Sequence, residues 1–240
     1  MKWGLCIIMI LNSKSRNETL AFHFILSYDV AMIKQAGRPR AADLEARNEN
    51  LIRTAGQLFL KQGYGKVSLE LIAREAHVAV RTIYVKFGGK AGLFQAVVIA
   101  NRNKFIAPQQ MEQDGRPFKE IVGEFSEHFL DMISEPDALE VQRMVIAEAR
   151  ANPEMAQTFF EAGPRQSREM LARFFARPDI RIQLRDEIDV SLLPGFLLNC
   201  VTGDGFSRFL FNPAVQPREE QMRHLRKRLE LFHASVLKQI

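Results

Sequence analysis

The chain is poor in the residues that build metal centres and disulfide scaffolds. Its 240 residues include two cysteines, Cys6 and Cys200, which lie far apart and have no metal-ligand spacing. The five histidines form no HExxH-type pair. These counts argue against a zinc finger and a disulfide framework, so we expect no metal and no other cofactor. A reducing cytoplasm suits this composition.

The sequence also lacks the motifs of common enzyme classes. It contains no Gly-rich phosphate loop and no nucleophile motif. Asp131, Glu148 and His128 could in principle form an acid/base group, but we interpret them as solvated or partly buried helix residues. We therefore expect the protein not to be an enzyme and to have no catalytic residue. Turnover of a defined substrate would contradict this expectation.

The chain does contain two short helical patterns around a tight break, in residues 68–87, SLELIAREAHVAVRTIYVKF. Apolar side chains recur at the three- and four-residue spacing of one helical face, at Leu69, Ile72, Ala73 and Ala76 and then at Val80, Ile83, Tyr84 and Phe87. Ser68 is a suitable N-cap for the first helix. The pattern predicts a helix-turn-helix unit, whose second helix enters the major groove of DNA. Periodicity alone also fits a helical hairpin from any helical bundle.

Neighbouring features favour the DNA-binding interpretation. A short basic arm, Gly37-Arg38-Pro39-Arg40, precedes an amphipathic helix predicted over residues 43–63. The buried side of this helix is predicted to consist of Leu44, Leu51, Ile52, Ala55, Leu58 and Phe59. Residues 34–104 carry 13 Lys/Arg against 5 Asp/Glu (net +8), whereas residues 105–240 carry 17 against 21 (net −4). Because polyanion binding is largely electrostatic, this asymmetry supports a nucleic-acid partner for residues 34–104 only. Taken alone, the charge count also fits a solvated basic surface.

Residues 1–33 form a separate predicted segment ahead of the basic arm. The apolar run at residues 3–11 is too short to span a bilayer, and we expect no membrane partner. The run resembles the core of a signal peptide, but export would remove a DNA-binding protein from its target. A second methionine, Met32, stands just before the arm. We therefore expect residues 1–33 to be a poorly ordered extension, or the product of a start site set too early.

Residues 105–240 predict a second, larger helical domain. Residues 108–115 are polar and predict a loop, Glu135-Pro136 and Gly163-Pro164 predict helix breaks, and residues 178–188 predict a connector. Residues 189–211 are apolar over most of the helical circumference, and residues 217–239 carry an apolar stripe. Two such helices can pair with their symmetry mates as a four-helix bundle, so we expect a homodimer through them. The alternative is that they pack within their own domain.

The residues of the N-terminal part resemble a known family. The segment from Gly37 to Val98 is similar to the N-terminal domain of tetracycline-repressor (TetR) family regulators. The matching residues are the arm Gly37-Arg38-Pro39-Arg40; Ala55, Leu58, Phe59, Gly63 and Tyr64; Val67, Ser68, Ile72, Ala73, Ala76 and Val78; and Thr82, Ile83, Tyr84, Phe87, Lys90, Leu93 and Phe94. Three positions differ from the usual pattern: His77 replaces a turn glycine, Ala79 replaces a capping Ser or Thr, and Arg81 replaces a small residue.

The resemblance implies an all-α fold with a three-helix helix-turn-helix DNA-binding domain at residues 34–104. It also implies a helical ligand-sensing and dimerisation domain at residues 105–240. A dimer would place its two recognition helices, residues 80–87, on the half-sites of a partly palindromic double-stranded DNA operator. The DNA-binding residues that we expect are Arg38, Arg40, Ser68, Arg81, Thr82, Tyr84, Lys86 and Lys90.

Within this set, Arg81 and Thr82 are expected at base edges because they lie early in the recognition helix. Tyr84, Lys86 and Lys90 are expected to hold phosphates, whereas Arg38 and Arg40 would follow the backbone or enter a minor groove. For Tyr84 the alternative is a buried ring whose hydroxyl group alone reaches DNA.

The resemblance also implies a small-molecule inducer bound among the C-terminal helices. Candidate pocket residues are Phe125, Phe129, Met132, Met144, Phe159 and Phe160, whose flat or flexible side chains suit an apolar or aromatic molecule. The expected function is a repressor that this molecule releases from its operator. A transcriptional activator and a DNA-binding dimer without a small-molecule ligand are the alternatives.

Overall fold

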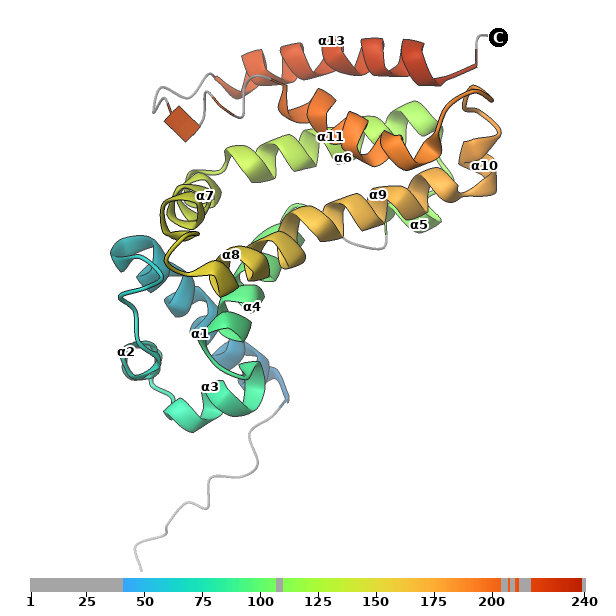
Figure 1. Ribbon diagram of the computed structural model, residues 1–240. Coiled ribbons are helices and arrows are strands. Elements are labelled where there is room, and N and C mark those ends of the chain that lie inside the picture. Colours follow the sequence, from blue (N-terminus) through green and yellow to red (C-terminus); the bar gives the residue numbers. More distant parts are fainter. Residues whose placement is uncertain (1–40, 107–109, 204–206, 208–209, 212–216, 239–240) are drawn as a thin grey trace, which may run out of the picture. The chain divides into compact units, whose positions relative to one another are not determined.

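The structure, a computed structural model, describes residues 41–106, 110–203, 207, 210–211 and 217–238. Within these ranges the regular elements are helices, and the β-pairing is limited to an isolated antiparallel bridge between Leu184 and Leu237. The predicted all-α fold is confirmed (Figure 1). The predicted extension 1–33 and the basic arm, with Arg38 and Arg40, lie outside the described residues.

The first hydrophobic core is built on α1 (Ala41–Gln62), α2 (Leu69–Glu75), α3 (Val80–Phe87) and α4 (Lys90–Asn103). The Phe59 ring centroid lies 5.3 Å from that of Tyr64 and 5.6 Å from that of Phe94. Such aromatic pairs contribute about 0.5–1.5 kcal/mol beyond the burial of their area. The predicted buried side of α1 is wrong at Leu44, which is 41% exposed in the first turn, well before Leu51, where burial begins.

Local chemistry sets the boundaries of the helix-turn-helix. Ser68 caps α2 as predicted, because its Oγ accepts a hydrogen bond from the backbone N–H of Leu71 at 3.1 Å. His77 has φ +55° in the turn, a left-handed conformation that glycine adopts more readily. Ala79 stands at the N-cap of α3 without a side-chain hydrogen bond. The turn therefore keeps its geometry despite two residues that do not favour it.

The junction between α3 and α4 is tight. Gly88 ends α3 with φ +74°, and α4 begins two residues later at Lys90. A Cβ atom at Gly92 would lie 1.8 Å from the backbone oxygen of Phe87, so only glycine allows this close approach. The first turn of α4 therefore lies directly against the end of α3.

The later helices follow α4 in the chain (Figure 1). They are α5 (Gln110–Gln113), α6 (Phe118–Ser134), α7 (Pro136–Glu148), α8 (Pro153–Phe160), the π-helix η1 (Glu161–Arg165), α9 (Gln166–Ala176), α10 (Pro178–Arg181), the 3-10 helix η2 (Val190–Leu192), α11 (Leu193–Thr202) and α13 (Arg218–Val236). All of them except α8 and η1 contribute side chains to the second hydrophobic core. Four rings at its centre are fully buried: Phe118, Phe174, Phe175 and Phe232. Helix α11 packs against α6, α9 and α13.

Three predicted boundaries in this region are corrected. The predicted loop at residues 108–115 contains α5, where burial of Met111 outweighs the polar composition of the segment. The predicted break at Gly163-Pro164 is a π-helical turn that carries the chain from α8 into α9, because the wider turn accommodates the missing N–H of proline. The helix predicted over residues 189–211 begins as η2 and α11 and stops at Gly203, which has φ +52°. The predicted break at Glu135-Pro136 is confirmed.

The first core also includes residues from beyond α4. Val145 of α7, Met155 of α8 and Ala162 of η1 are buried in the same cluster as Phe59 and Phe94. Helices α7 and α8 and the π-helix η1 therefore pack directly on the helix-turn-helix core through these side chains. The domain boundary predicted between residues 104 and 105 stays a prediction.

Among the described residues, no single helix has the length and apolar character needed to cross a membrane. Helices α3 and α4 reach that length and apolar character only when they are taken together, and the chain bends by 69° between them.

Candidate DNA-binding surface and ligand cavity

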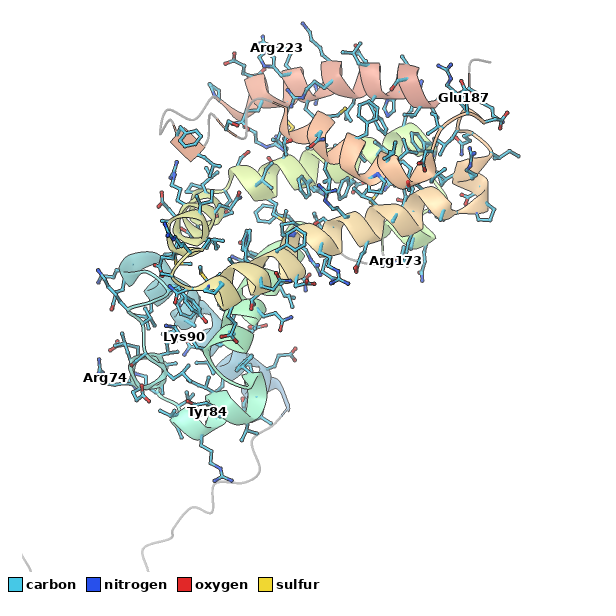
Figure 2. The ribbon with its side chains drawn as sticks, viewed as in Figure 1. Arg74, Tyr84, Lys90, Arg173, Glu187 and Arg223 are labelled. Atoms are coloured by element: carbon cyan, nitrogen blue, oxygen red, sulfur yellow. The ribbon has the colours of Figure 1, made fainter. Side chains whose placement is uncertain are left out.

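Helix α3 has one face in the core and one face in solvent. Ile83 has no exposed surface, whereas Val85 is 74% exposed and Arg81 and Lys86 are also exposed. The prediction that Tyr84 lies on the buried stripe is wrong, because its side chain is 56% exposed (Figure 2). The stripe is narrower than the sequence pattern indicates: Ile83 is the buried residue of α3, and Val80 and Phe87 pack against the same core while only partly buried.

The cationic residues on this side differ in how firmly they are held. None of the described residues accepts a hydrogen bond from Arg81, so its guanidinium donors are unoccupied within the part of the chain that the structure describes. The Nζ of Lys86 donates a hydrogen bond to Oδ1 of Asn48 on α1. Thr82 is half-buried one residue after Arg81. Arg81 is therefore the most available donor at the start of α3.

Lys90 is engaged within the protein. Its Nζ lies 3.5 Å from the carbonyl oxygen of Gly65 and 4.3 Å from the centroid of the Tyr64 ring. Burial lowers the pKa of Lys90, and the nearby Glu148 carboxylate opposes this effect. Lys90 stands at the start of α4, as Figure 2 shows, so a phosphate there would have to share its ammonium group with these contacts.

Glu148 was considered in the sequence only as part of an acid/base group, and its structural role was missed. Its Oε2 accepts hydrogen bonds from the backbone N–H of Gly65 at 2.8 Å and from Nδ2 of Asn152 at 3.1 Å. A Cβ atom at Gly63, which has φ +83°, would lie 2.5 Å from Oε1 of Glu148. The two glycines in Gly63-Tyr64-Gly65 are the signal in the sequence that another group approaches this turn closely.

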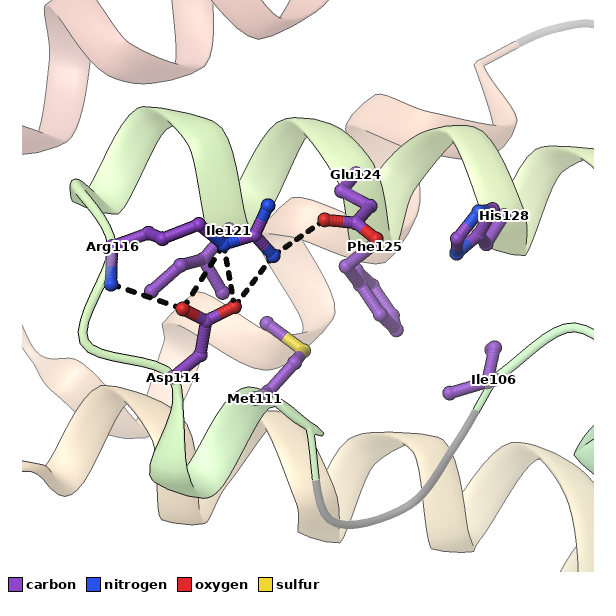
Figure 3. Close-up of a pocket in the computed structure, with 8 residues that line it drawn as sticks. All are labelled: Ile106, Met111, Asp114, Arg116, Ile121, Glu124, Phe125 and His128. Atoms are coloured by element: carbon purple, nitrogen blue, oxygen red, sulfur yellow. Dashed lines mark hydrogen bonds and ion pairs between the residues drawn. The ribbon is translucent and has the colours of Figure 1, made fainter.

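Asp131 and His128, the other two residues considered for an acid/base group, have different neighbours from Glu148. Asp131 forms an ion pair with Arg218, with 2.7 Å between Oδ2 and Nη2. His128 lines a small hollow of about 30 Å³ on α6, together with Phe125 and Arg116 (Figure 3). That volume suits about one or two water molecules. The structure therefore does not bring Asp131, Glu148 and His128 together as an acid/base group.

The larger hollow is a cavity of about 370 Å³, a size typical of small-molecule sites. Three of the predicted pocket residues line it: Phe129, Met132 and Phe159. Phe125 lines the smaller hollow instead, Met144 packs against the first core, and Phe160 is 48% exposed. The six predicted residues lie on three helices, α6, α7 and α8, and these helices run in different directions (Figure 1).

The wall of this cavity is drawn from α4, α6, α7, α8, η1, α9 and α11. The described lining residues are Val97, Val98, Asn101, Arg102, Phe129, Met132, Ile133, Ala138, Val141, Gln142, Phe159, Gly163, Pro164, Ser167, Arg168, Leu198, Asn199 and Thr202. The contribution of α4 was missed in the sequence, because α4 was assigned to the DNA-binding domain. A search of the described residues finds no cluster of His, Cys, Asp or Glu able to hold a metal ion.

Comparison with protein-family models gives two matches in separate segments. Residues 51–97 match the model described as bacterial regulatory proteins of the tetR family. Residues 120–235 match the model described as the C-terminal domain of AefR-like transcriptional repressors. No curated protein sequence matches the chain.

Solved structures share the fold at low sequence identity. A protein from Mesorhizobium loti assigned to the TetR family of transcriptional regulators is 20% identical, with a TM-score of 0.66, and the match covers 84% of this chain and 100% of that one. The flavonoid-responsive regulator FrrA is 22% identical, with a TM-score of 0.63 and coverage of 82% and 100%. NalD, the secondary repressor of the MexAB-OprM multidrug efflux pump in Pseudomonas aeruginosa, is 21% identical, with a TM-score of 0.58 and coverage of 82% and 100%.

The two family matches span the helix-turn-helix and the helices around the cavity, in the order that the fold requires. They agree with the solvent-facing basic residues of α3 and with the resemblance in residues 37–98. The chain therefore belongs to the TetR family of DNA-binding transcriptional regulators.

Proposed function

We propose that the protein is a repressor that binds a partly palindromic operator as a dimer and leaves it when a small molecule occupies the larger cavity. The observation that carries the proposal is the outward face of α3, where Arg81 and Lys86 are exposed while Ile83 anchors the helix. NalD is a repressor and FrrA responds to flavonoids, which supports a repressor with a ligand as the preferred version.

The proposed base-reading residues are Arg81 and Thr82, at the first turn of α3. An arginine can donate two hydrogen bonds to O6 and N7 of guanine, which discriminates by about 1–3 kcal/mol against the wrong base. The proposed phosphate contacts are Tyr84, Lys86 and Lys90, and Ser68, the N-cap of α2, is a further proposed contact. The arm residues Arg38 and Arg40 complete the set from outside the described residues.

The proposed dimer forms through the C-terminal helices. Apolar side chains remain in solvent on three elements there: Leu192 on η2 is 67% exposed, Phe196 on α11 is 42% exposed and Leu231 on α13 is 72% exposed. Covering such side chains with a second copy would bury their apolar area at about 25 cal/mol per Å². A Leu231→Glu variant is expected to be monomeric by sedimentation and to lose operator affinity, whereas a dimer that survives this change would reject the interface.

The proposed signal passes through α4. Val97, Val98, Asn101 and Arg102 of α4 line the cavity, while its first turn touches the end of α3 at Gly92. A ligand that displaces α4 would therefore rotate both recognition helices of the dimer away from successive major grooves. The ligand can shift this equilibrium only by the difference in its affinity for the two arrangements.

The proposal is tested by selecting bound duplexes from a random DNA pool and then screening compounds that release the selected operator. Recovery of a partly palindromic site, together with a compound that weakens its binding, is the expected result. An operator without any releasing compound would favour the DNA-binding dimer that has no ligand. Transcription that rises when the protein binds its operator would favour the activator.

A further inference from the structure

We propose that the ligand of the larger cavity is an anion, an apolar or aromatic molecule that carries a carboxylate or an equivalent acidic group. This inference rests on the proposed ligand-responsive function and adds the chemical class of the ligand. The inference depends on the charge of the cavity wall and on the hydrogen bonds of Arg102 and Arg168, which line the cavity.

The charged residues of the wall carry one sign. Arg102 of α4 and Arg168 of α9 both line the cavity, and none of its described lining residues is Asp or Glu. The other polar lining residues, which include Asn101, Gln142 and Asn199, are neutral. A guanidinium attracts and can chelate a carboxylate, because its planar N–H groups match the two carboxylate oxygens. A cationic ligand would meet repulsion in the same place.

Arg102 is poorly satisfied by the protein itself. It donates to the carbonyl oxygen of Ala162 and to Oδ1 of Asn103, and both hydrogen bonds are long, at 3.4 Å. Burial lowers the pKa of Arg102. A partly desolvated cation with weak hydrogen bonds gains most from a charged acceptor.

Arg168 differs from the other arginines of its helical run. Arg165 pairs with Glu161 and Glu169, and Arg173 pairs with Glu112. None of the described residues accepts a hydrogen bond from Arg168 or forms an ion pair with it. Unlike Arg165 and Arg173, Arg168 lines the cavity and has no carboxylate partner among the described residues.

Gly195 of α11 leaves room for this side chain. A Cβ atom at Gly195 would lie 3.4 Å from Nη1 of Arg168, so the guanidinium extends from α9 across to α11. Leu198 and Asn199, one turn further along α11, line the cavity as well. The position of the guanidinium at this wall makes it available to a molecule in the cavity.

The remainder of the wall suits an apolar body. Phe129, Met132 and Phe159 come from different helices, and the cavity volume of about 370 Å³ holds a ring system with a short acidic side chain. Such a molecule would place its rings among these side chains. Its acidic group would lie between α4 and α9, which carry Arg102 and Arg168. The wall therefore predicts a ligand with two chemically distinct ends.

The test measures binding of three matched probes to the full-length protein by isothermal titration calorimetry: 2-naphthylacetate, 2-naphthylacetamide and 2-(2-naphthyl)ethylammonium. The acid is expected to bind at least about tenfold more tightly than the amide, equivalent to about 1.4 kcal/mol. The ammonium compound is expected to bind most weakly. Phenylacetate and 1-pyrenebutyrate extend the acid series to smaller and larger ring systems.

Matched variants assign the charge preference to residues. Arg102→Gln and Arg168→Gln are each expected to reduce the preference for acid over amide to less than about threefold, with amide binding unchanged. Arg165→Gln removes the same charge one helical turn from Arg168, outside the cavity, and is expected to keep the preference. Melting temperatures of all variants check that each one is folded.

Three results would overturn the inference: amide or ammonium binding as tight as acid binding, an equal effect of Arg165→Gln, or no binding by any acid of the series at about 1 mM. These results are separate from a failure of the proposed function. Release of the selected operator by a neutral compound would leave a sensor with a different ligand class. If no selective operator is found, the proposed function itself fails.

Discussion

The carboxylate of Glu148, at the end of α7, accepts a hydrogen bond of 2.8 Å from the backbone N–H of Gly65, a residue 83 positions earlier in the chain. Gly65 stands in the turn before α2, and its carbonyl oxygen lies 3.5 Å from Nζ of Lys90. One carboxylate therefore ties α7 to the turn that leads into the helix-turn-helix.

A Glu148→Ala substitution is expected to lower the free energy of unfolding by about 1–2 kcal/mol, because it removes a charge-assisted hydrogen bond and leaves a backbone N–H to water. Urea denaturation followed by circular dichroism measures this change. The control is Glu140→Ala, which removes a surface carboxylate from the same helix and is expected to cost much less. Equal losses in the two variants would mean that the bond to Gly65 contributes no stability.

The same contact predicts non-additive behaviour at Gly63. A Cβ atom there would meet Oε1 of Glu148 at 2.5 Å, whereas one at Gly88, which also has positive φ, would meet nothing within 4 Å. Gly88→Ala is expected to cost about 1–2 kcal/mol from backbone strain alone, and Gly63→Ala more than that. In a Glu148→Ala background, Gly63→Ala should cost no more than Gly88→Ala. An unchanged difference between the two glycine variants would reject the steric explanation.

Arg81→Ala is expected to weaken binding to the selected operator by about 1–3 kcal/mol while changing non-specific binding little, because a base contact carries sequence information. Fluorescence anisotropy with operator and scrambled duplexes, at several salt concentrations, measures both affinities. Lys86→Ala serves as the comparison, since loss of a phosphate contact should weaken both duplexes alike and reduce the salt slope by about 1. Equal losses on both duplexes in Arg81→Ala would remove its proposed base-reading role.

Ala79→Ser is expected to raise the free energy of unfolding by about 0.5–1 kcal/mol, because Ala79 is the N-cap of α3 and offers no side-chain acceptor. Thermal denaturation of the two proteins measures the gain. Ser68→Ala is the reverse experiment, since Ser68 already caps α2, and it should cost a similar amount. No gain in Ala79→Ser, together with a normal loss in Ser68→Ala, would show that the α3 terminus is satisfied in another way.

His233 predicts a pH dependence of stability. Its ring packs against Phe118 and Phe232 at centroid distances of 5.9 Å, and burial, with a smaller effect of Lys119, lowers its pKa below the ordinary 6.5. Well above pH 6.5 the imidazole is neutral in both the folded and the unfolded state and has no effect on stability. As the pH falls below 6.5, the unfolded chain takes up a proton that the folded protein binds less well, so stability is lost.

A His233→Phe variant is expected to lack this loss between pH 7.5 and pH 5.5. Urea midpoints of both proteins over that interval measure it, and the lowered pKa values of Asp114 and Asp179 place their titrations below the interval. Parallel pH profiles for the two proteins would exclude His233 as the titrating group.

Much of the fold was predictable because local periodicity dominates a helical chain. The boundaries of α2 and α3, the cap at Ser68 and the break at Glu135-Pro136 follow from residues within one or two turns of each other. His77 stands where the family pattern has a turn glycine, and it adopts the positive φ that glycine favours. The predictions were wrong where a short pattern fits more than one structure. Tyr84 on α3 is exposed rather than buried, and Pro164 lies inside η1 rather than at a helix break.

By itself, the sequence determined the helical class of the protein, the place of its helix-turn-helix and the basic side that this unit carries, because those properties depend on side chains a few residues apart. Only the tertiary structure decided that Glu148 reaches Gly65, that α4 joins the wall of the cavity and that Arg102 and Arg168 line it together. Glu148 and Gly65 are 83 positions apart, and Arg102 and Arg168 are also far apart in the sequence. The packing of whole helices, rather than any local preference, brings such residues into contact.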